Sequence, residues 1–291
     1  MTLLADAELQ SDLKQPDLKP VLAPPGPLPE GCQQRFGKGV YWVDGLAVDY
    51  FESLRHLFEG MVALTRNAKQ TQRKTNLMAI NVNISNLAHA QPRLKRILNT
   101  ADMLYCDGAG IIWGSKLMGT PLPMRFTAAD WLFEWIEAMS DAGLSMYFLA
   151  GEPGVISSAQ ALLDARVPGH KVVGMHHGYV LGDSALNQAV IDEINAKKPD
   201  ILVVGMGCPL QEYWIDDHRH LLDVPVCFAI GATWDYLTGK VPRCPAWMGE
   251  NGLEWLFRFI IEPKRMFNRY IMGNPGYIWR VFWQSLGKKR A

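Results

Sequence analysis

The chain has 291 residues, enough to bury one large hydrophobic core or two smaller ones. Hydrophobic residues make up 48% of the chain and charged residues 20%, which is the composition of a globular protein. Basic and acidic residues balance at 29 each, so the overall charge does not indicate a nucleic-acid-binding protein.

The sequence predicts neither membrane insertion nor disulfide bonding. No apolar run approaches the roughly 18 residues that a membrane span needs, and the first residues lack the pattern of a signal peptide. The five cysteines are odd in number, and no two are spaced as C-x-x-C. We therefore expect free cysteines and a reducing compartment.

The first expected element is a disordered leader. Residues 1–36 contain six of the eighteen prolines and little apolar periodicity, so burial could not offset the entropy lost on ordering them. Residues 39–48 then alternate apolar and polar side chains, which predicts an edge strand or hairpin. Asp49 follows as the expected N-cap of a helix whose apolar face includes Leu57 and Met61.

From residue 77 onward one unit repeats along the chain. A short apolar run ends in a polar or glycine-bearing turn, and an amphipathic helix follows. The runs lie at residues 77–80, 103–106, 146–150, 171–174, 201–204 and 224–230. This alternation predicts an α/β fold, with a Rossmann-like, mostly parallel sheet and helices on both faces. Ligands of such sheets bind at the carboxyl ends of the strands, where these turns lie.

The run at residues 103–106 leads directly into Asp107 and Gly108. The glycine predicts a tight turn with positive φ at a strand-to-helix junction, with the carboxylate facing a cleft. On the local pattern alone Asp107 has two interpretations, a helix N-cap or a catalytic group, and N-caps are the commoner of the two.

Two other turns carry pairs of glycines. Gly151-x-x-Gly154 and Gly205-x-Gly207 each open a helix, where backbone N–H groups and the positive end of the helix dipole suit an anion such as a diphosphate. Neither segment is a complete G-x-G-x-x-G, and close packing explains such glycines equally well.

The C-terminal segment is basic and aromatic. Residues 254–291 contain eight basic residues against two acidic ones, interleaved with nine aromatic residues. This composition is typical of a helical element in the headgroup plane of a membrane, while a helix docked on the domain is a compatible alternative. We expect a leader at 1–36, a catalytic domain at 37–245 and a helical, membrane-associating appendage at 246–291.

Several short motifs together resemble those of one enzyme family. They run from Gly39 to Tyr270 in that family's order and with its spacing. They are Asn83, Asp107-Gly108, Arg125 to Asp130, residues 148–151, 176–179, 200–205 and 207–212, Asp235, Arg243 to Pro245, residues 253–258, Glu262-Pro263, Arg265 and Arg269. The set resembles the WecG/TagA/CpsF glycosyltransferases, also called glycosyltransferase family 26.

The resemblance implies an activity and its partners. Members of the family transfer a sugar from a UDP-sugar to a sugar on a polyprenyl diphosphate, with inversion and without a bound metal or another cofactor. They act at the inner face of the bacterial cytoplasmic membrane, to which the chain would bind peripherally. A homo-oligomer is left open. An exopolysaccharide pathway is expected at least as readily as teichoic acid or enterobacterial antigen synthesis.

The resemblance also implies roles for individual residues. Asp107 resembles the family's proposed general base, and Arg125 and Gln211 line the same cleft, so these three are the expected catalytic residues. The residues expected to bind substrate, from the resemblance and from the turns described above, are Asn81, Asn83, Gly108, Gly151, Gly205, Gly207, Asp235, Arg258, Arg265 and Arg269. The three arginines are expected to close over the diphosphate.

Four positions depart from the family's usual pattern. Asn81 stands where Thr is common and Ala128 where Gly is common, and Leu210 and Cys244 replace a usual Lys and Ala. The missing lysine beside the cleft leaves the donor sugar open among N-acetylmannosamine, its uronic acid and glucose, which are all used within the family.

Two other functions fit part of the sequence. A nicotinamide-dependent oxidoreductase would need a complete dinucleotide fingerprint with an acid about 20 residues further on, and no first strand supplies one. A membrane-tethered scaffold or sensor that binds a UDP-sugar without turnover would keep the glycines and the C-terminal segment but would not need Asp107.

Overall fold

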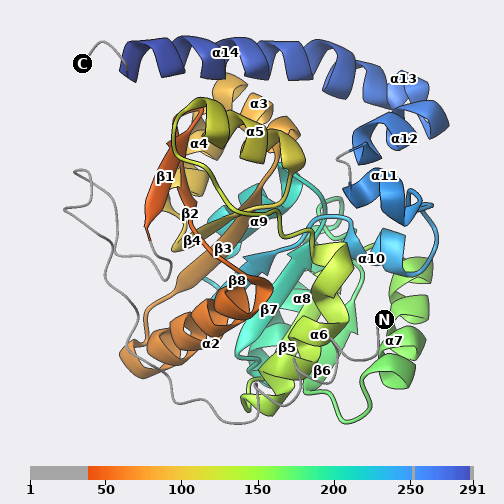
Figure 1. Ribbon diagram of the computed structural model, residues 1–291. Helices are drawn as coiled ribbons and strands as arrows, with labels where there is room; N and C mark the ends of the chain where they lie inside the picture. Colours follow the sequence, from red (N-terminus) through yellow and green to blue (C-terminus); the bar gives the residue numbers. More distant parts are fainter. Residues whose placement is uncertain (1–38, 251–252, 289–291) are drawn as a thin grey trace.

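A six-stranded parallel sheet organises the chain. The computed structural model describes residues 39–250 and 253–288, so the expected leader at 1–36 lies outside the described residues (Figure 1). The strand order is β4-β3-β8-β7-β5-β6, and helices cover both faces of the sheet. The expected α/β fold is confirmed. In the described ranges no helix is both long and apolar enough to cross a membrane.

The strands of this sheet are short and apolar. They are β3 (Thr75–Ile80), β4 (Met103–Cys106), β5 (Met146–Ala150), β6 (Val172–His176), β7 (Ile201–Gly205) and β8 (Val226–Ala229). Along β7, Leu202 and Val204 pack into one hydrophobic cluster, whereas Ile201 and Val203 pack into the other. Because both faces are covered, the central strands are continuous apolar runs.

Two layers of helices bury the two faces. The first layer contains α3 (Val82–Ala90), α4 (Pro92–Thr100), α5 (Ala109–Leu117), α8 (Ser184–Lys197) and α9 (Leu210–His218). The second contains α2 (Leu54–Thr71), α6 (Ala128–Asp141), α7 (Pro153–Arg166) and α10 (Thr233–Leu237). The C-terminal helices are α11 (Ala246–Glu250), α12 (Glu254–Ile261), α13 (Pro263–Met266), the π-helix η1 (Phe267–Met272) and α14 (Gly273–Lys288).

The expected hairpin forms a sheet of its own. Strands β1 (Val40–Val43) and β2 (Leu46–Asp49) pair antiparallel, separately from the main sheet. The N-cap of α2 is Ser53, so the assignment of Asp49 as a helix cap was wrong. Asp49 ends β2 instead, and its Oδ2 accepts a hydrogen bond from the backbone N of Leu104 at 2.7 Å. The carboxylate thereby fastens the hairpin to β4.

The last helix, α14, lies across the first helix layer, over α3 and α5 (Figure 1). Its inner face is buried through Tyr277, Val281 and Ser285, whereas Trp279 and Trp283 on its outer face are more than half exposed. Tyr277 packs on Gly114 of α5, where an added Cβ would lie 2.0 Å from the tyrosine hydroxyl. The helix is therefore docked on the domain and still presents aromatic side chains outward.

A buried ion pair anchors α14. The guanidinium of Arg280 donates to Oδ1 and Oδ2 of Asp44 at 3.0 and 2.6 Å, and to Oδ1 of Asn86 at 2.7 Å. The side chain of Asp44, in the turn between β1 and β2, is 1% exposed and also accepts a hydrogen bond from Ser85. One contact therefore joins the hairpin, α3 and α14.

Replacing Arg280 with Met should loosen α14. The change leaves the Asp44 carboxylate buried without its cation, which costs about 3 to 5 kcal/mol. Since the lost contact joins α14 to the β1–β2 hairpin, we expect the substitution to speed amide hydrogen exchange more in residues 273–288 and 40–49 than in the core strands. Adding Asp44→Asn should recover part of the protection.

The matched control for this prediction is Arg96→Met, because Arg96 pairs with Asp216 at 3.1 Å on the surface and is 60% exposed. Loss of such a pair costs less than about 1 kcal/mol. Equal exchange in the Arg280 and Arg96 variants would show that the buried pair does not hold α14.

Candidate active site

A cavity of about 550 Å³ opens at the carboxyl end of the sheet. The turns that follow β3, β4, β7 and β8 line it, and so do α5, α12, η1 and α14. It brings together most of the expected site residues, namely Asn81, Asn83, Asp107, Gly108, Arg125, Gly207, Gln211, Arg258 and Arg269. The strand order explains this grouping, since β4, β3, β8 and β7 are consecutive in the sheet.

Three other expected residues do not line this cavity. Gly151 follows β5, which lies beyond β7 in the sheet. Gly205 packs closely against the turn after β8, because an added Cβ would lie 2.6 Å from the carbonyl oxygen of Gly231. The carboxylate of Asp235 pairs with Lys240 outside the cavity lining, with 3.4 Å between Oδ1 and Nζ. The side chain of Arg265 lies outside the described part of the structure.

Strand β4 delivers Asp107 to the cavity. The N-cap of α5 is Gly108, with no side-chain capping bond, so Asp107 is not the helix cap. The expected positive φ at Gly108 was wrong, since its φ is −141°. An added Cβ at Gly108 would lie 2.9 Å from Cβ of Asn81. Glycine is therefore needed for the close approach of two turns rather than for its backbone conformation.

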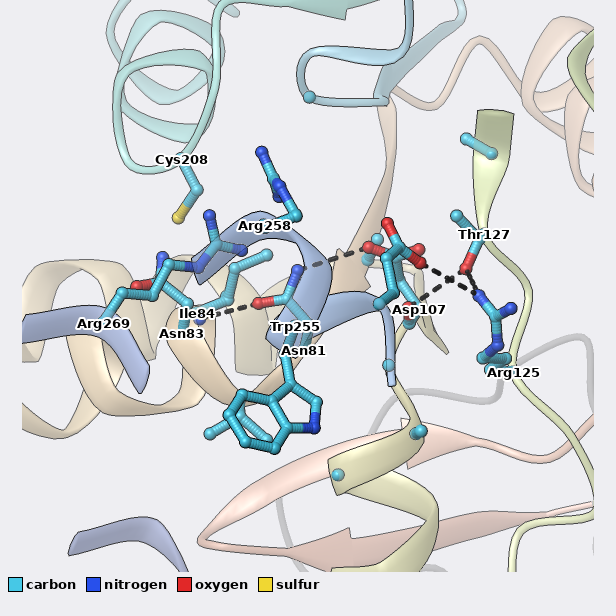
Figure 2. A pocket seen from close by; sticks show the side chains of 18 of the residues that line it. Asn81, Asn83, Ile84, Asp107, Arg125, Thr127, Cys208, Trp255, Arg258 and Arg269 are labelled. Atoms are coloured by element: carbon cyan, nitrogen blue, oxygen red, sulfur yellow. Dashed lines mark hydrogen bonds and ion pairs between the residues drawn. The ribbon is translucent and has the colours of Figure 1, made fainter. Parts of the chain in front are cut away.

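Asn81 joins the ends of β3 and β4. Its Oδ1 accepts a hydrogen bond from the backbone N of Ile84 at 3.1 Å and so caps α3. Its Nδ2 donates to Oδ2 of Asp107 at 3.3 Å, as Figure 2 shows. Both polar groups of the amide are engaged, which makes Asn81 a positioning residue for the carboxylate.

The surroundings of Asp107 favour a carboxyl group that titrates near neutral pH. Burial raises the pKa of Asp107 to about 7, and the charge of Glu254 acts in the same direction. The hydrogen bond from Asn81 and the charge of Arg125 oppose this rise. A carboxylate with such a pKa is a stronger base than an ordinary aspartate and can accept a proton from a hydroxyl group.

The guanidinium of Arg125 is held beside this carboxyl group by several contacts. Its Nη1 donates to Oγ1 of Thr127, and its Nη2 donates to the carbonyl oxygen of Gly249 at 3.2 Å (Figure 2). Thr127 in turn donates to the carbonyl oxygen of Asp107 at 3.4 Å. Sequence reasoning did not identify Thr127, because its role depends on the loop before α6 folding back onto β4.

Gln211 shapes the neighbouring turn. Its Oε1 accepts a hydrogen bond from the backbone N of Gly231 at 2.9 Å, and its Nε2 donates to Oε1 of Glu212 at 2.8 Å. Gln211 thereby ties α9 to the turn after β8. Burial raises the pKa of Glu212, and the hydrogen bond from Gln211 opposes this rise.

Two guanidinium groups form the other end of the cavity. In the view of Figure 2, Arg269 lies on the opposite side of Asn81 from Asp107 and Arg125, and Arg258 lies above Asn81. They come from α12 and η1, whereas Asp107 directly follows β4. Nowhere in residues 39–250 and 253–288 do three His, Cys, Asp or Glu side chains gather as a metal site would require.

The fold and the cavity define a class of enzyme. A parallel α/β sheet with a titratable carboxylate at one end of a cleft and guanidinium groups at the other suits the transfer of a group away from an anionic leaving group. Residues 51–291 match the sequence profile described as the glycosyl transferase WecG/TagA/CpsF family. The chain belongs to this family and is a glycosyltransferase.

Individual relatives carry a more specific name. Proteins called N-acetylglucosaminyldiphosphoundecaprenol N-acetyl-beta-D-mannosaminyltransferase occur in Bacillus spizizenii and Staphylococcus aureus. The Bacillus protein is 29% identical over 205 residues, which cover 70% of this chain and 77% of the relative. The Staphylococcus protein is 27% identical over 229 residues, which cover 77% of this chain and 86% of the relative.

Replacing Asn81 with Ser should keep the cap of α3 and remove the hydrogen bond to Asp107. Serine keeps an oxygen that caps α3, so the free energy of unfolding should change by less than about 1 kcal/mol. The amide donor is lost, and since its hydrogen bond lowers the pKa of Asp107, that pKa should rise. Activity that needs ionised Asp107 increases as pH rises through the pKa, so the ascending limb of kcat/KM should move to higher pH.

The variant Asn81→Ala should shift the ascending limb of the kcat/KM profile to higher pH in the same way. Because alanine cannot cap α3, this variant should also lower the free energy of unfolding by about 1 kcal/mol. Rate profiles from pH 5 to pH 9 and thermal denaturation measure the two effects separately. A limb that stays in place in both variants would show that the amide does not influence Asp107.

Proposed function

We propose that this chain is an inverting, metal-independent glycosyltransferase that moves a sugar from a UDP-sugar to a sugar carried on a polyprenyl diphosphate. The observation that carries the proposal is that one cavity holds the carboxylate of Asp107 and, apart from it in Figure 2, the guanidinium groups of Arg258 and Arg269. A single displacement needs a base on one side of the anomeric carbon and support for the departing diphosphate on the other.

In the proposed reaction an acceptor hydroxyl is the nucleophile. Its oxygen forms a bond to the anomeric carbon while its proton passes to the carboxylate of Asp107. The bond from that carbon to the diphosphate oxygen breaks with its electron pair, and UDP leaves. The guanidinium groups of Arg258 and Arg269 offset the negative charge that develops on the leaving group, which is the work a metal ion would otherwise do.

The names of the relatives support the choice of substrates. Both are named for transfer of an N-acetylmannosaminyl group to N-acetylglucosamine on undecaprenyl diphosphate. We propose an acceptor of this chemical class for the present chain, and N-acetylmannosamine, its uronic acid or glucose as the transferred sugar. The product would enter cell-envelope polysaccharide synthesis, with an exopolysaccharide among the candidates.

The membrane surface is the proposed third partner. Trp279 and Trp283 on α14 are 61% and 54% exposed, and Ile278, which directly precedes Trp279, is 57% exposed. Aromatic and aliphatic side chains on a helix in a basic segment suit binding to the headgroup region of the inner membrane face. A polyprenyl diphosphate is anchored in the same membrane, so residues 246–291 would bring the cavity to the acceptor.

Replacing Asp107 with Asn tests the catalytic assignment. Asparagine has nearly the same shape but cannot accept the proton, so turnover should fall by a factor of about 100 to 10,000. UDP affinity should change by less than about twofold, because the guanidinium groups stay in place. Release of UDP by the purified protein, with polyprenyl-diphosphate-linked N-acetylglucosamine and a set of UDP-sugars, measures the first quantity. Calorimetry measures the second.

The same assay with EDTA tests metal independence, and activity should persist in the chelator. Substantial turnover by the Asp107→Asn variant would overturn the role of the base. UDP binding without turnover on any donor or acceptor would instead favour the scaffold interpretation of the sequence.

Replacing both Trp279 and Trp283 with Ser should weaken membrane binding. The outer face of α14 loses its two largest apolar side chains, so partition onto vesicles with anionic lipid should fall by about tenfold or more. Leu181→Ser is a suitable control, since Leu181 is 53% exposed but lies outside the C-terminal helices. Vesicle sedimentation measures the binding, and equal partition of both variants would contradict a membrane contact through α14.

A further inference from the structure

The hydroxyl group of Tyr236 has no hydrogen-bond partner among the residues that the structure describes, although its oxygen is buried. Tyr236 lies on α10 and lines the cavity. A buried polar group without a partner costs free energy and in native structures is normally satisfied by protein, water or ligand. The sequence did not single out this residue, because neither the turns nor the family motifs include it.

The surroundings of this hydroxyl are cationic. The guanidinium carbon of Arg258 lies 5.1 Å from the centre of the Tyr236 ring, in a cation–π contact. Burial raises the pKa of Tyr236 to about 12, while the charges of Arg258 and Arg269 act in the opposite direction. At neutral pH the phenol therefore keeps its proton and can donate it to a hydrogen bond.

A second donor close by is also without a partner. Nε of Arg269 is buried and has no hydrogen-bond partner in the described residues. The guanidinium of Arg269 lies 5.4 Å from the ring centre of Tyr270, which also lines the cavity. This end of the cavity thus holds two unsatisfied donors beside two positive charges.

The chemistry of these groups restricts the ligand. Unsatisfied donors require acceptor atoms, and two guanidinium groups favour acceptors that carry negative charge. Neutral sugar hydroxyls and a uracil ring supply acceptor atoms without negative charge. The diphosphate of a sugar nucleotide supplies acceptor atoms that carry negative charge. The proposed base, Asp107, lines the same cavity as these groups.

We infer that the hydroxyl of Tyr236 donates a hydrogen bond to the diphosphate of the donor, beside Arg258 and Arg269. This inference rests on the proposed function, in which the donor is a UDP-sugar. The contact strengthens as charge develops on the departing diphosphate, so Tyr236 contributes to stabilising the transition state as well as to binding.

Calorimetric titration of Tyr236→Phe with UDP, UMP and uridine tests the inference. Phenylalanine keeps the ring below Arg258 and removes only the hydroxyl. UDP affinity should fall by about tenfold, as expected for a hydrogen bond to a charged group, while uridine affinity stays unchanged. The melting temperature of the free variant should stay equal or rise, because an unsatisfied buried group has been removed.

The control is Tyr147→Phe, since Tyr147 is fully buried on β5 and does not line the cavity. Its UDP affinity should equal that of the unaltered protein. A loss confined to UDP places the Tyr236 contact at the β-phosphate, and a loss shared with UMP places it at the α-phosphate. Either result supports the inference.

Other outcomes overturn it. UDP affinity that is unchanged in Tyr236→Phe would show that the hydroxyl does not meet the diphosphate, and the proposed function would still stand. An equal loss for UDP and uridine would place Tyr236 at the nucleoside or in a purely structural role. If the unaltered protein fails to bind UDP, the proposed donor is wrong and the inference falls with it.

Discussion

The geometry of the site depends on the contact between the turns after β3 and β4. These strands are parallel neighbours, so their last residues, Ile80 and Cys106, are paired and both chains turn at the same edge. Gly108 lets the two turns approach closely, and the amide of Asn81 then reaches Asp107 at 3.3 Å. The proposed base is therefore positioned by the sheet and by the cap of α3 rather than by a mobile loop.

The C-terminal helices form the part of the cavity that the sheet and its turns leave open. α12 brings Glu254 and Arg258 into the cavity, and burial is the main reason why the pKa of Asp107 is high. α14 closes the same region and is held by Arg280 on Asp44. The segment proposed to meet the membrane thus also lines the cavity of the carboxylate and supplies Glu254, whose charge raises the pKa of Asp107. Docking of these helices is thereby linked to the strength of the base.

The repeating apolar runs were sufficient to predict a parallel α/β sheet, because a strand buried on both faces leaves a clear pattern. The strand order was not readable from the sequence, so the sequence did not show that Gly151, which follows β5, would not line the cavity. Asp107 was identifiable from its place after a buried strand and from the family motifs. Thr127 lies within the motif at residues 125–130 but was not singled out, and Tyr236 lies outside the motifs, because the roles of both arise from contacts between segments far apart in the chain.

The central claim is that Asp107 and the arginines act on opposite sides of one anomeric carbon. The configuration of the new glycosidic bond tests this most directly, by NMR of the product formed from an α-linked UDP-sugar. The account predicts a β-linked product, since a single displacement inverts the carbon. An α-linked product would require two displacements or attack from the side of the leaving group, and would contradict the assigned geometry.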